Sequence, residues 1–368
     1  MKIALVSTGL GRVLRGFESF TESLFESLRE YAPDVNVTLF QGGGRSGDRR
    51  LVVPNYHRYD APARWFGYEK GNLLEKRSFA LALYPLLRWG HYDIVHYNEL
   101  VMGSALYHLR RIFGGKFKLL YCAGSTWSPG HYHHRSDFAQ LLTEPAYYEA
   151  RKFGMPADRL FLVPYGVNPE QFSAESRFQR RETRSELGIP QDSKAILTVA
   201  IIDRQTKRID YLIRELSAVE REVWLLVAGQ KTNESDSLER EANRLLNGRC
   251  RFVSWPREKI PFLYGAADLF VLTSLVEAFG LVIIEAMLSG LPVIIHNGPV
   301  FRWISEGTSV ILTDMSIEGN LRDVFERVLT QKELPSSRAV AAGRFAWEIL
   351  VPQYVHMYEQ VEKGQMVC

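Results

Sequence analysis

The chain has 368 residues, enough for two domains of ordinary size, and its 46% hydrophobic and 24% charged residues are typical of a globular protein. The sequence contains no run of about 18 apolar residues, so it predicts no transmembrane helix. Three cysteines without a CxxC spacing exclude a disulfide framework and a structural zinc site, and they favour a reducing cytosol.

The net charge of +3 is too small to indicate nucleic-acid binding, but it is unevenly distributed. Residues 1–165 hold 21 Lys and Arg against 15 Asp and Glu, which gives +6 and leaves −3 for the remainder. A basic first half favours an anionic partner such as a phospholipid surface, although chance distribution of surface charge gives the same numbers. We therefore expect a cytoplasmic protein, with peripheral contact at the inner membrane face as an open alternative.

In the first half, short buried runs alternate with helical patterns. Apolar residues at 20, 24, 25 and 28 predict a helix over Glu18–Tyr31. Arg77–Gly90 predicts another helix, apolar with basic and aromatic ends, which lies in the domain core or docks on a membrane surface. The runs with strand character are 2–7, which is a first strand rather than a signal peptide, 36–41, 92–98, 117–124 and 159–168.

A polar, charged stretch at 169–194 then predicts an interdomain linker with a short helix. The second half repeats the strand–helix alternation, with strands expected at 195–201, 222–229, 250–255, 267–274, 291–297 and 309–313. Near-continuous apolar strands separated by helices indicate parallel sheets covered on both faces. The sequence thus predicts an α/β fold of two doubly wound, Rossmann-like domains that face a cleft, where ligands bind beyond the carboxyl ends of the strands.

Two carboxylates interrupt the apolar stretch Ser274–Ile295. Glu277 follows the strand 267–274, and Glu285 lies seven intervening residues further on, inside the helix that Gly280 allows to start. Buried carboxylates need a partner or a function. The backbone amides of Phe279, Gly280 and Leu281 lie at the helix N-terminus, which favours a phosphate.

Two cations, Arg204 and Lys207, follow the strand 195–201 and suit a diphosphate leaving group. Together with the helix start and the two carboxylates, they fit a nucleotide-sugar, one carboxylate accepting from ribose hydroxyls and the other from the sugar. The alternatives are helix capping or an ion pair for Glu277 and Glu285, and a solvated loop for the two cations.

The run "AADLFVLTSLVEAFGLVIIEAMLSGLPVI" resembles the signature of the retaining glycosyltransferases of family four, which have the GT-B fold. The resemblance extends to "LFLVPYGVNPEQF", "DRQTKRIDYLI", "RGFESFTESLFESL" and the closing "FAWEILVPQYVHMYEQV". It implies an acceptor-binding domain at 1–168, onto which a C-terminal helix at 350–363 packs back. The linker at 169–194 and a nucleotide-sugar domain at 195–349 complete the chain.

The resemblance also implies roles for particular residues. Arg204 and Lys207 bind the donor diphosphate, Glu277 the transferred sugar and Glu285 the ribose, and of these Arg204, Lys207 and Glu277 are the catalytic set. The other expected donor contacts are the amides of Phe279, Gly280 and Leu281, the segment Val253–Pro256 with Trp255 beside the base, and Gly16 of the first domain. No metal or other cofactor is expected, because cationic side chains and helix ends neutralise the leaving group.

The sequence departs from the family where a histidine often points at the reacting sugar, because Ala123, Gly124 and Ser125 stand there. Ser125, His131 or the neighbouring His133 and His134 are candidate substitutes, with a plain surface loop as the alternative. His96 is either an acceptor contact or a buried structural histidine. Arg302 stands where the family often has a glutamate.

The sequence predicts a metal-independent, retaining hexosyltransferase with a nucleoside-diphosphate sugar, UDP favoured, as donor. A glycan, a lipid-linked molecule or a small molecule is the acceptor. The alternatives are a non-catalytic nucleotide-sugar-binding protein and a GT-B nucleotide-sugar epimerase.

Overall fold

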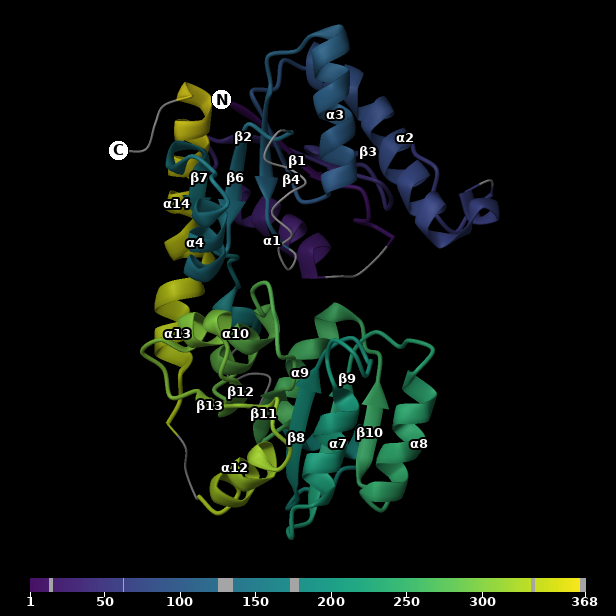
Figure 1. Cartoon of the computed structure of the whole chain (residues 1–368), viewed down its shortest axis with the longest axis vertical. Coiled ribbons are helices and arrows are strands. Elements are labelled where there is room, and N and C mark those ends of the chain that lie inside the picture. Colours follow the sequence, from purple (N-terminus) through teal and green to yellow (C-terminus); the bar gives the residue numbers. More distant parts are fainter. Residues whose placement is uncertain (13–15, 62, 125–134, 173–178, 332–334, 365–368) are drawn as a thin grey trace. The chain divides into compact units, whose positions relative to one another are not determined.

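The computed structural model describes residues 1–12, 16–61, 63–124, 135–172, 179–331 and 335–364. The chain divides into two compact units, one formed by Met1–Gly166 with Trp347–Cys368 and the other by Val167–Ala346 (Figure 1). Each unit is built on its own parallel sheet.

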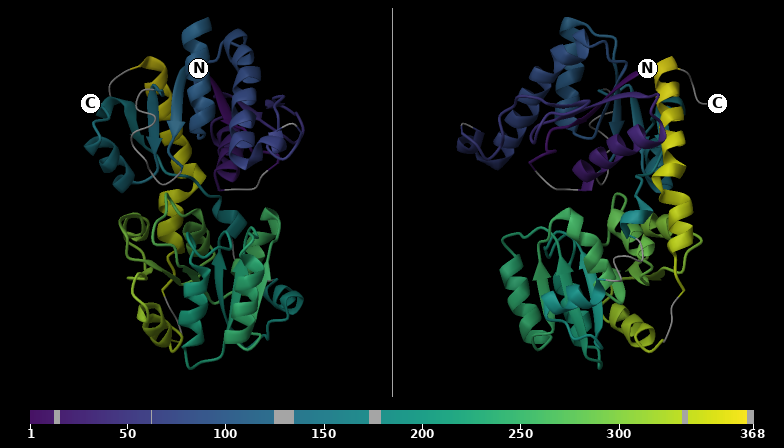
Figure 2. Two further views of the ribbon diagram at one scale, coloured as in Figure 1. Left: turned by 45° about the vertical axis from the view of Figure 1, so that its right-hand side comes forward. Right: turned by 180° about the vertical axis from the view of Figure 1, so that it is seen from behind.

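The sheet of the first unit has seven strands among the described residues, in the order β3-β2-β1-β4-β5-β6-β7. The central strands are almost entirely apolar, because helices cover both faces (Figure 2). In β1, for example, the side chains from Ile3 to Val6 are at most 1% exposed. The strands are β1 (Lys2–Ser7), β2 (Asn36–Gln41), β3 (Arg50–Val52), β4 (Ile94–Tyr97), β5 (Lys118–Cys122), β6 (Phe138–Leu141) and β7 (Leu160–Leu162).

The helices of the first unit form two packed groups. One group contains α1 (Gly16–Tyr31) and α14 (Trp347–Lys363), which contact each other. The other contains α2 (Gly67–Trp89) and α3 (Leu100–Phe113), which also pack together. The remaining helices are η1 (Ala63–Phe66), α4 (Glu144–Lys152) and η3 (Ala157–Arg159).

The C-terminal helix α14 belongs to the first unit, where it packs on α1, β4 and β5. Tyr354 ties it down, since its hydroxyl donates to the carbonyl of Pro164 (2.9 Å) and accepts from Gln140 Nε2 (2.7 Å). The helix begins at Trp347, three residues before the start expected from the sequence.

The sheet of the second unit has six strands in the part of the chain described, in the order β10-β9-β8-β11-β12-β13. All six expected strands of the second half are found. They are β8 (Lys194–Val199), β9 (Val223–Ala228), β10 (Cys250–Val253), β11 (Leu269–Leu272), β12 (Val293–His296) and β13 (Ile311–Thr313). The helices are η4 (Pro169–Phe172), α6 (Arg180–Leu187), α7 (Ile209–Ser217), α8 (Ser235–Leu245), η5 (Arg257–Lys259), α9 (Ile260–Ala266), α10 (Leu281–Leu288), α11 (Pro299–Ser305), α12 (Asn320–Val328) and α13 (Arg338–Phe345).

The sequence predicts a linker with a short helix at 169–194. The described residues of this stretch, 169–172 and 179–194, lie in the second unit, and the short helix is α6, which packs on α9. Arg184 is fully buried and pairs with Asp268 (2.7 Å), and Arg180 pairs with the same carboxylate (2.8 Å). The pairs of Arg180 and Arg184 with Asp268, together with the buried Leu187, attach this helix to the second unit.

No helix in the described ranges is both long enough and apolar enough to span a bilayer. One face of helix α2 is buried and the other is exposed. Phe79, Leu83 and Leu87 lie in the core, whereas Leu81 and Trp89 are exposed. It is therefore a core helix of the first unit with an exposed second face.

Candidate functional site

Four strands of the second unit end at one edge of its sheet. Since β10, β9, β8 and β11 are neighbours and run parallel, the loops that follow them lie side by side. These loops carry Arg204 and Lys207 after β8, Trp255 after β10, and Glu277 after β11. The topology therefore brings four of the predicted donor-site residues to one edge.

The loop after β8 holds Lys207 in place through a carboxylate turn. Asp203 Oδ1 accepts from the backbone amides of Thr206 (2.8 Å) and Lys207 (2.7 Å). Thr273, just after β11, donates its hydroxyl to the carbonyl of Lys207 (2.7 Å). The turn and this cross-link fix the backbone from which the Lys207 ammonium projects.

The Lys207 ammonium donates to Oε1 of Glu277. Both side chains are largely buried, with exposed fractions of 20% for Lys207 and 14% for Glu277. The structure therefore joins two of the three residues expected to be catalytic, and each neutralises the other.

Arg204 lies against α8. Its guanidinium pairs with Glu241 Oε2 (2.9 Å) and contacts Ser237 Oγ (3.4 Å), and its backbone amide donates to Glu234 Oε2 (3.0 Å). Both cations expected at a diphosphate are thus paired with carboxylates of the same unit.

Glu285 is buried in α10, with 4% of the residue exposed. Its Oε2 accepts from the hydroxyl of Tyr264 (2.9 Å), and Arg257 of η5 lies 3.9 Å from its Oε1. Burial raises the pKa of the Glu285 carboxyl, and Arg257 and the Tyr264 hydroxyl oppose that rise. Because η5 follows the loop that carries Trp255, Glu285 lies near the segment expected beside the base.

Tyr264 is a site residue that the sequence did not identify. It is fully buried in α9, and its ring packs against Phe172 (centroids 5.7 Å apart) and Phe270 (5.8 Å). One tyrosine in an apolar helix gives no sign of its partner, which lies 21 residues further along the chain.

Gly280 makes the start of α10 possible. Its φ of 87° is in the left-handed region, and an added Cβ would lie 2.8 Å from Ile283 Cδ1. As the N-cap it offers no side-chain acceptor to the first amides of the helix, which begins at Leu281. The buried Phe279 ring anchors this turn against Trp303 (6.3 Å) and Phe345 (5.9 Å).

Trp255 follows β10, and Arg302 lies in α11. Trp255 is half-buried, and the Lys259 ammonium lies 5.6 Å from its ring centroid. Arg302, in α11, donates to Oδ1 (2.8 Å) and to the carbonyl oxygen (3.2 Å) of Asn297.

The structure places Gly16 and His96 in the first unit. Gly16 begins α1, with open space where a Cβ would lie. His96 is only 3% exposed, its Nδ1 is 2.8 Å from the Tyr358 hydroxyl of α14, and burial lowers its pKa to about 4. This placement favours the structural role for His96 over contact with an acceptor. Ser125 and His131, with His133 and His134, lie outside the described residues.

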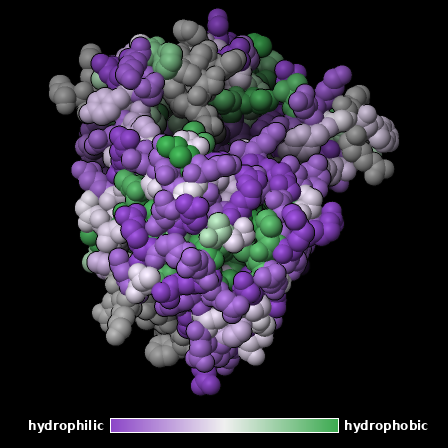
Figure 3. All heavy atoms as spheres, turned by 60° about the horizontal axis from the view of Figure 1, so that its bottom comes forward, coloured by the Kyte–Doolittle hydropathy of each residue, from purple (hydrophilic) through white to green (hydrophobic). Residues whose placement is uncertain are grey.

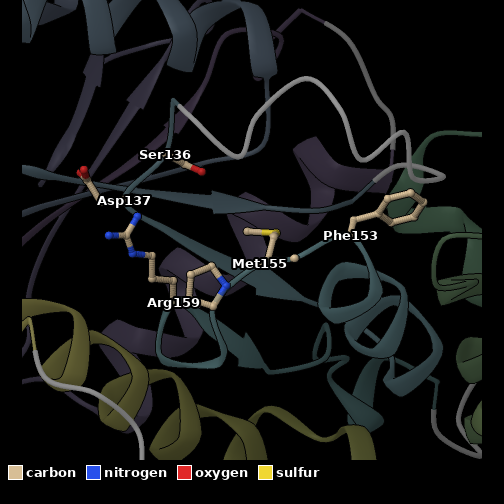
Figure 4. A pocket seen from close by; sticks show the side chains of 7 residues that line it. Ser136, Asp137, Phe153, Met155 and Arg159 are labelled. Carbon is tan, nitrogen blue, oxygen red and sulfur yellow. The ribbon is translucent and has the colours of Figure 1, made fainter.

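A separate pocket of about 310 Å³ opens in the first unit (Figure 4). None of the candidate site residues lines it, and it lies where β6 begins, at the opposite end of the strands from their carboxyl termini. Asp137 is already paired with Arg110 (2.5 Å). The residues that line the pocket are Ser136, Asp137, Phe153, Gly154, Met155, Pro156 and Arg159.

In the part of the chain that the structure describes, no group of three or more His, Cys, Asp or Glu side chains is arranged to hold a metal ion. The expectation of a metal-independent reaction stays a prediction.

Residues 179–338 match the family described as Glycosyl transferases group 1. The chain is 31% identical over 213 residues to D-inositol 3-phosphate glycosyltransferase of Mycolicibacterium smegmatis, a match that covers 55% of this chain and 48% of that protein. It is also 31% identical over 175 residues to mannosylfructose-phosphate synthase of Agrobacterium fabrum, covering 44% of this chain and 38% of that protein. The chain thus spans about half or less of the length of these two relatives.

Among solved structures, the chain is similar to sucrose-phosphate synthase from Thermosynechococcus elongatus. The TM-score is 0.79 at 21% identity, covering 99% of this chain and 100% of that one. The Anabaena protein HepE in complex with UDP-glucose gives a TM-score of 0.76 at 18% identity, covering 98% and 99%. These likenesses show the fold, and they confirm the two Rossmann-like units expected from the sequence. Residues 179–338 therefore match the glycosyl transferases group 1 family, and the fold of the chain is GT-B, like that of these solved structures.

Proposed function

We propose that the protein transfers a hexose from a nucleoside-diphosphate sugar, UDP favoured, to an acceptor hydroxyl with retained anomeric configuration. The observation that carries the proposal is the placement of Lys207 and Glu277 at the edge of the second sheet where α10 begins. A cation, a carboxylate and a helix N-terminus together suit a diphosphate joined to a sugar.

In this proposal the donor diphosphate takes the place of Glu277 beside the Lys207 ammonium. The amides at the start of α10 face the same anion, and Arg204 joins it when it exchanges Glu241 for phosphate. The freed Glu277 carboxylate then accepts hydrogen bonds from hydroxyls of the sugar. Donor binding thereby replaces two internal ion pairs with contacts to the substrate.

Glu285 is proposed to bind the ribose. Its Oε1 is not the oxygen that Tyr264 engages, so a ribose hydroxyl can donate to it. Such a bond favours the ionised carboxylate and offsets the rise in pKa that burial causes. The segment 253–256, with Trp255, lies beside the base.

In the reaction, the bond between the anomeric carbon and the diphosphate oxygen breaks, and the oxygen keeps the electron pair. The acceptor oxygen bonds to the same carbon on the face that the diphosphate leaves, and its proton passes to the leaving oxygen. Stabilisation of the growing negative charge by Lys207 and Arg204 is the main contribution of the protein. Under this scheme no side chain acts as an essential base, and no metal is required.

Preference for a UDP donor is supported by the similar HepE structure, whose bound ligand is UDP-glucose. The acceptor class, which is a glycan, a lipid-linked molecule or a small molecule, stays a proposal from the sequence. The same holds for a cytoplasmic location and for peripheral contact with a membrane.

A thermal-shift screen of nucleotide-sugars tests donor binding, because a ligand that binds only the folded protein raises its melting temperature. Transfer or hydrolysis of the radiolabelled winning donor then separates an enzyme from a non-catalytic binding protein. The second candidate function, a non-catalytic nucleotide-sugar-binding protein, is supported by the absence of the family histidine near Ala123–Ser125. It predicts a thermal shift without turnover, whereas the enzyme predicts both. Nuclear magnetic resonance of the product distinguishes retention from inversion, and added chelator tests metal independence.

A further inference from the structure

One end of the first unit exposes large apolar side chains together with arginines. We name this the tip surface and define it by Leu81, Arg88 and Trp89 of α2 and Arg111, Ile112 and Phe113 of α3. The exposed fractions of its apolar members are 75% for Trp89, 71% for Ile112, 61% for Leu81 and 55% for Phe113. Single exposed apolar residues are ordinary, but four large ones on the C-terminal halves of two packed helices need an explanation.

Contacts between the ends of α2 and α3 hold the tip surface together. The two helices pack along each other, as Figure 1 also shows. Tyr84 of α2 lies with its ring 6.2 Å from that of Phe113, and its hydroxyl donates to the carbonyl of Gly114, which ends α3. Arg88 is one turn beyond Tyr84 and two turns beyond Leu81. On the surface of α2 it therefore lies between Tyr84, which contacts the end of α3, and the exposed Leu81.

The charge at this end is positive and uncompensated. Arg88 and Arg111 form no ion pair within the described residues. Two acidic residues linked to these helix ends, Asp93 shortly after α2 and Asp137 beside Arg110 of α3, already have partners. Asp93 accepts from the Lys2 amide (2.6 Å), and Asp137 pairs with Arg110 (2.5 Å). The cations of the tip surface therefore remain available to an anion outside the chain.

We propose that the tip surface docks on an anionic lipid bilayer. Tryptophan, aliphatic side chains and arginines on one surface are what an interfacial element presents to lipid headgroups and the upper acyl chains. By contrast, hydrophobic residues on the face drawn in Figure 3 lie in small groups among hydrophilic ones. Charge complementarity selects the occupant, since uncompensated arginines favour anionic headgroups and Ile112 and Phe113 add contacts that a polyanion in water does not offer.

Sedimentation with lipid vesicles tests the proposal on the full-length protein. Binding is expected to vesicles that contain phosphatidylglycerol and to weaken with added salt, whereas pure phosphatidylcholine binds much less. Each basic side chain near an anionic surface strengthens binding about fivefold, so Arg88→Gln/Arg111→Gln is expected to lower the partition coefficient about 25-fold. Trp89→Ser/Phe113→Ser is expected to weaken binding to the same vesicles at high salt as well, because the lost contacts are apolar.

Arg181→Gln/Arg240→Gln is the matched control, because it removes two exposed charges from the second unit and is expected to leave binding unchanged. Unchanged melting temperatures establish that all variants are folded. Equal binding to both vesicle types, or equal losses in the control and tip variants, would overturn the proposal. So would a concentration-dependent dimer that Trp89→Ser/Phe113→Ser abolishes in the absence of vesicle binding, because the surface would then be a contact between copies of the chain.

Discussion

Replacing Glu277 with glutamine is predicted to strengthen the binding of UDP. The Lys207 ammonium is paired with Glu277, so a diphosphate must displace that carboxylate before it gains the cation. Glutamine keeps the size of the side chain and removes its charge. UDP lacks the transferred hexose and therefore loses no contact with Glu277 in exchange.

The magnitude follows from the burial of the pair. Exposed ion pairs contribute about 1 kcal/mol or less. Removing one partner of a fully buried pair costs about 3–5 kcal/mol. With exposed fractions of 20% and 14%, the Lys207–Glu277 pair lies between these limits, and we take about 2 kcal/mol. This predicts that Glu277→Gln lowers the dissociation constant of UDP about 30-fold.

Isothermal titration calorimetry measures the dissociation constant directly. Glu258→Gln, at an exposed glutamate of η5, is the matched control and is expected to bind UDP like the wild type. The double variant Lys207→Ala/Glu277→Gln is expected to lose the gain, because no cation is left to release. A dissociation constant for UDP that stays unchanged in Glu277→Gln would refute the assignment of Lys207 to the diphosphate.

Three further predictions concern the frame of the site and the first unit. Gly280→Ala is expected to destabilise the second unit by about 1–2 kcal/mol, because alanine is strained at a φ of 87°; calorimetric unfolding measures this, and an unchanged melting temperature contradicts it. Tyr264→Phe removes a hydrogen bond that lowers the pKa of Glu285, so the pH at which UDP binding weakens should rise, and an unshifted pH profile of the Kd contradicts the link. The pKa of His96 is lowered to about 4, so the unfolded chain binds the extra proton between that value and the ordinary value of 6.5; stability therefore falls as the pH drops through this range, by about 2 kcal/mol from pH 7 to pH 5. Urea unfolding of the wild type and His96→Phe at both pH values checks this, and equal pH dependence in the two proteins counts against it.

The sequence predicts the sheets better than the side-chain partners. Strands such as β8 and β11 are continuous apolar runs, and a buried parallel strand has no other requirement. The short strands β3 and β6 escape prediction, because β3 has only three residues, none of them buried, and β6 has only four. A strand of three or four residues is too short to give a recognisable apolar run, and this limits the prediction of strands.

The sequence predicts where the loops of the candidate site lie, but not which side chains pair with each other there. Two loops that follow neighbouring parallel strands must end at one edge, so Lys207 and Glu277 were expected near each other. Nothing in the spacing indicates that Arg204 turns to Glu241, since that partner lies on a helix three elements later. For the same reason Tyr264 beside Glu285 and Arg184 beside Asp268 were missed, because long-range pairing of single polar residues leaves no periodic signal.

Lys207 carries the central claim, that the second unit holds the diphosphate of a nucleotide-sugar where α10 begins. The most direct measurement is single-turnover release of UDP from the donor identified by thermal shift, for the wild type and for Lys207→Ala at equal melting temperature. Loss of one charged donor to the leaving group predicts a rate that falls by about 10²–10³-fold. A Lys207→Ala protein that releases UDP at the rate of the wild type contradicts the account.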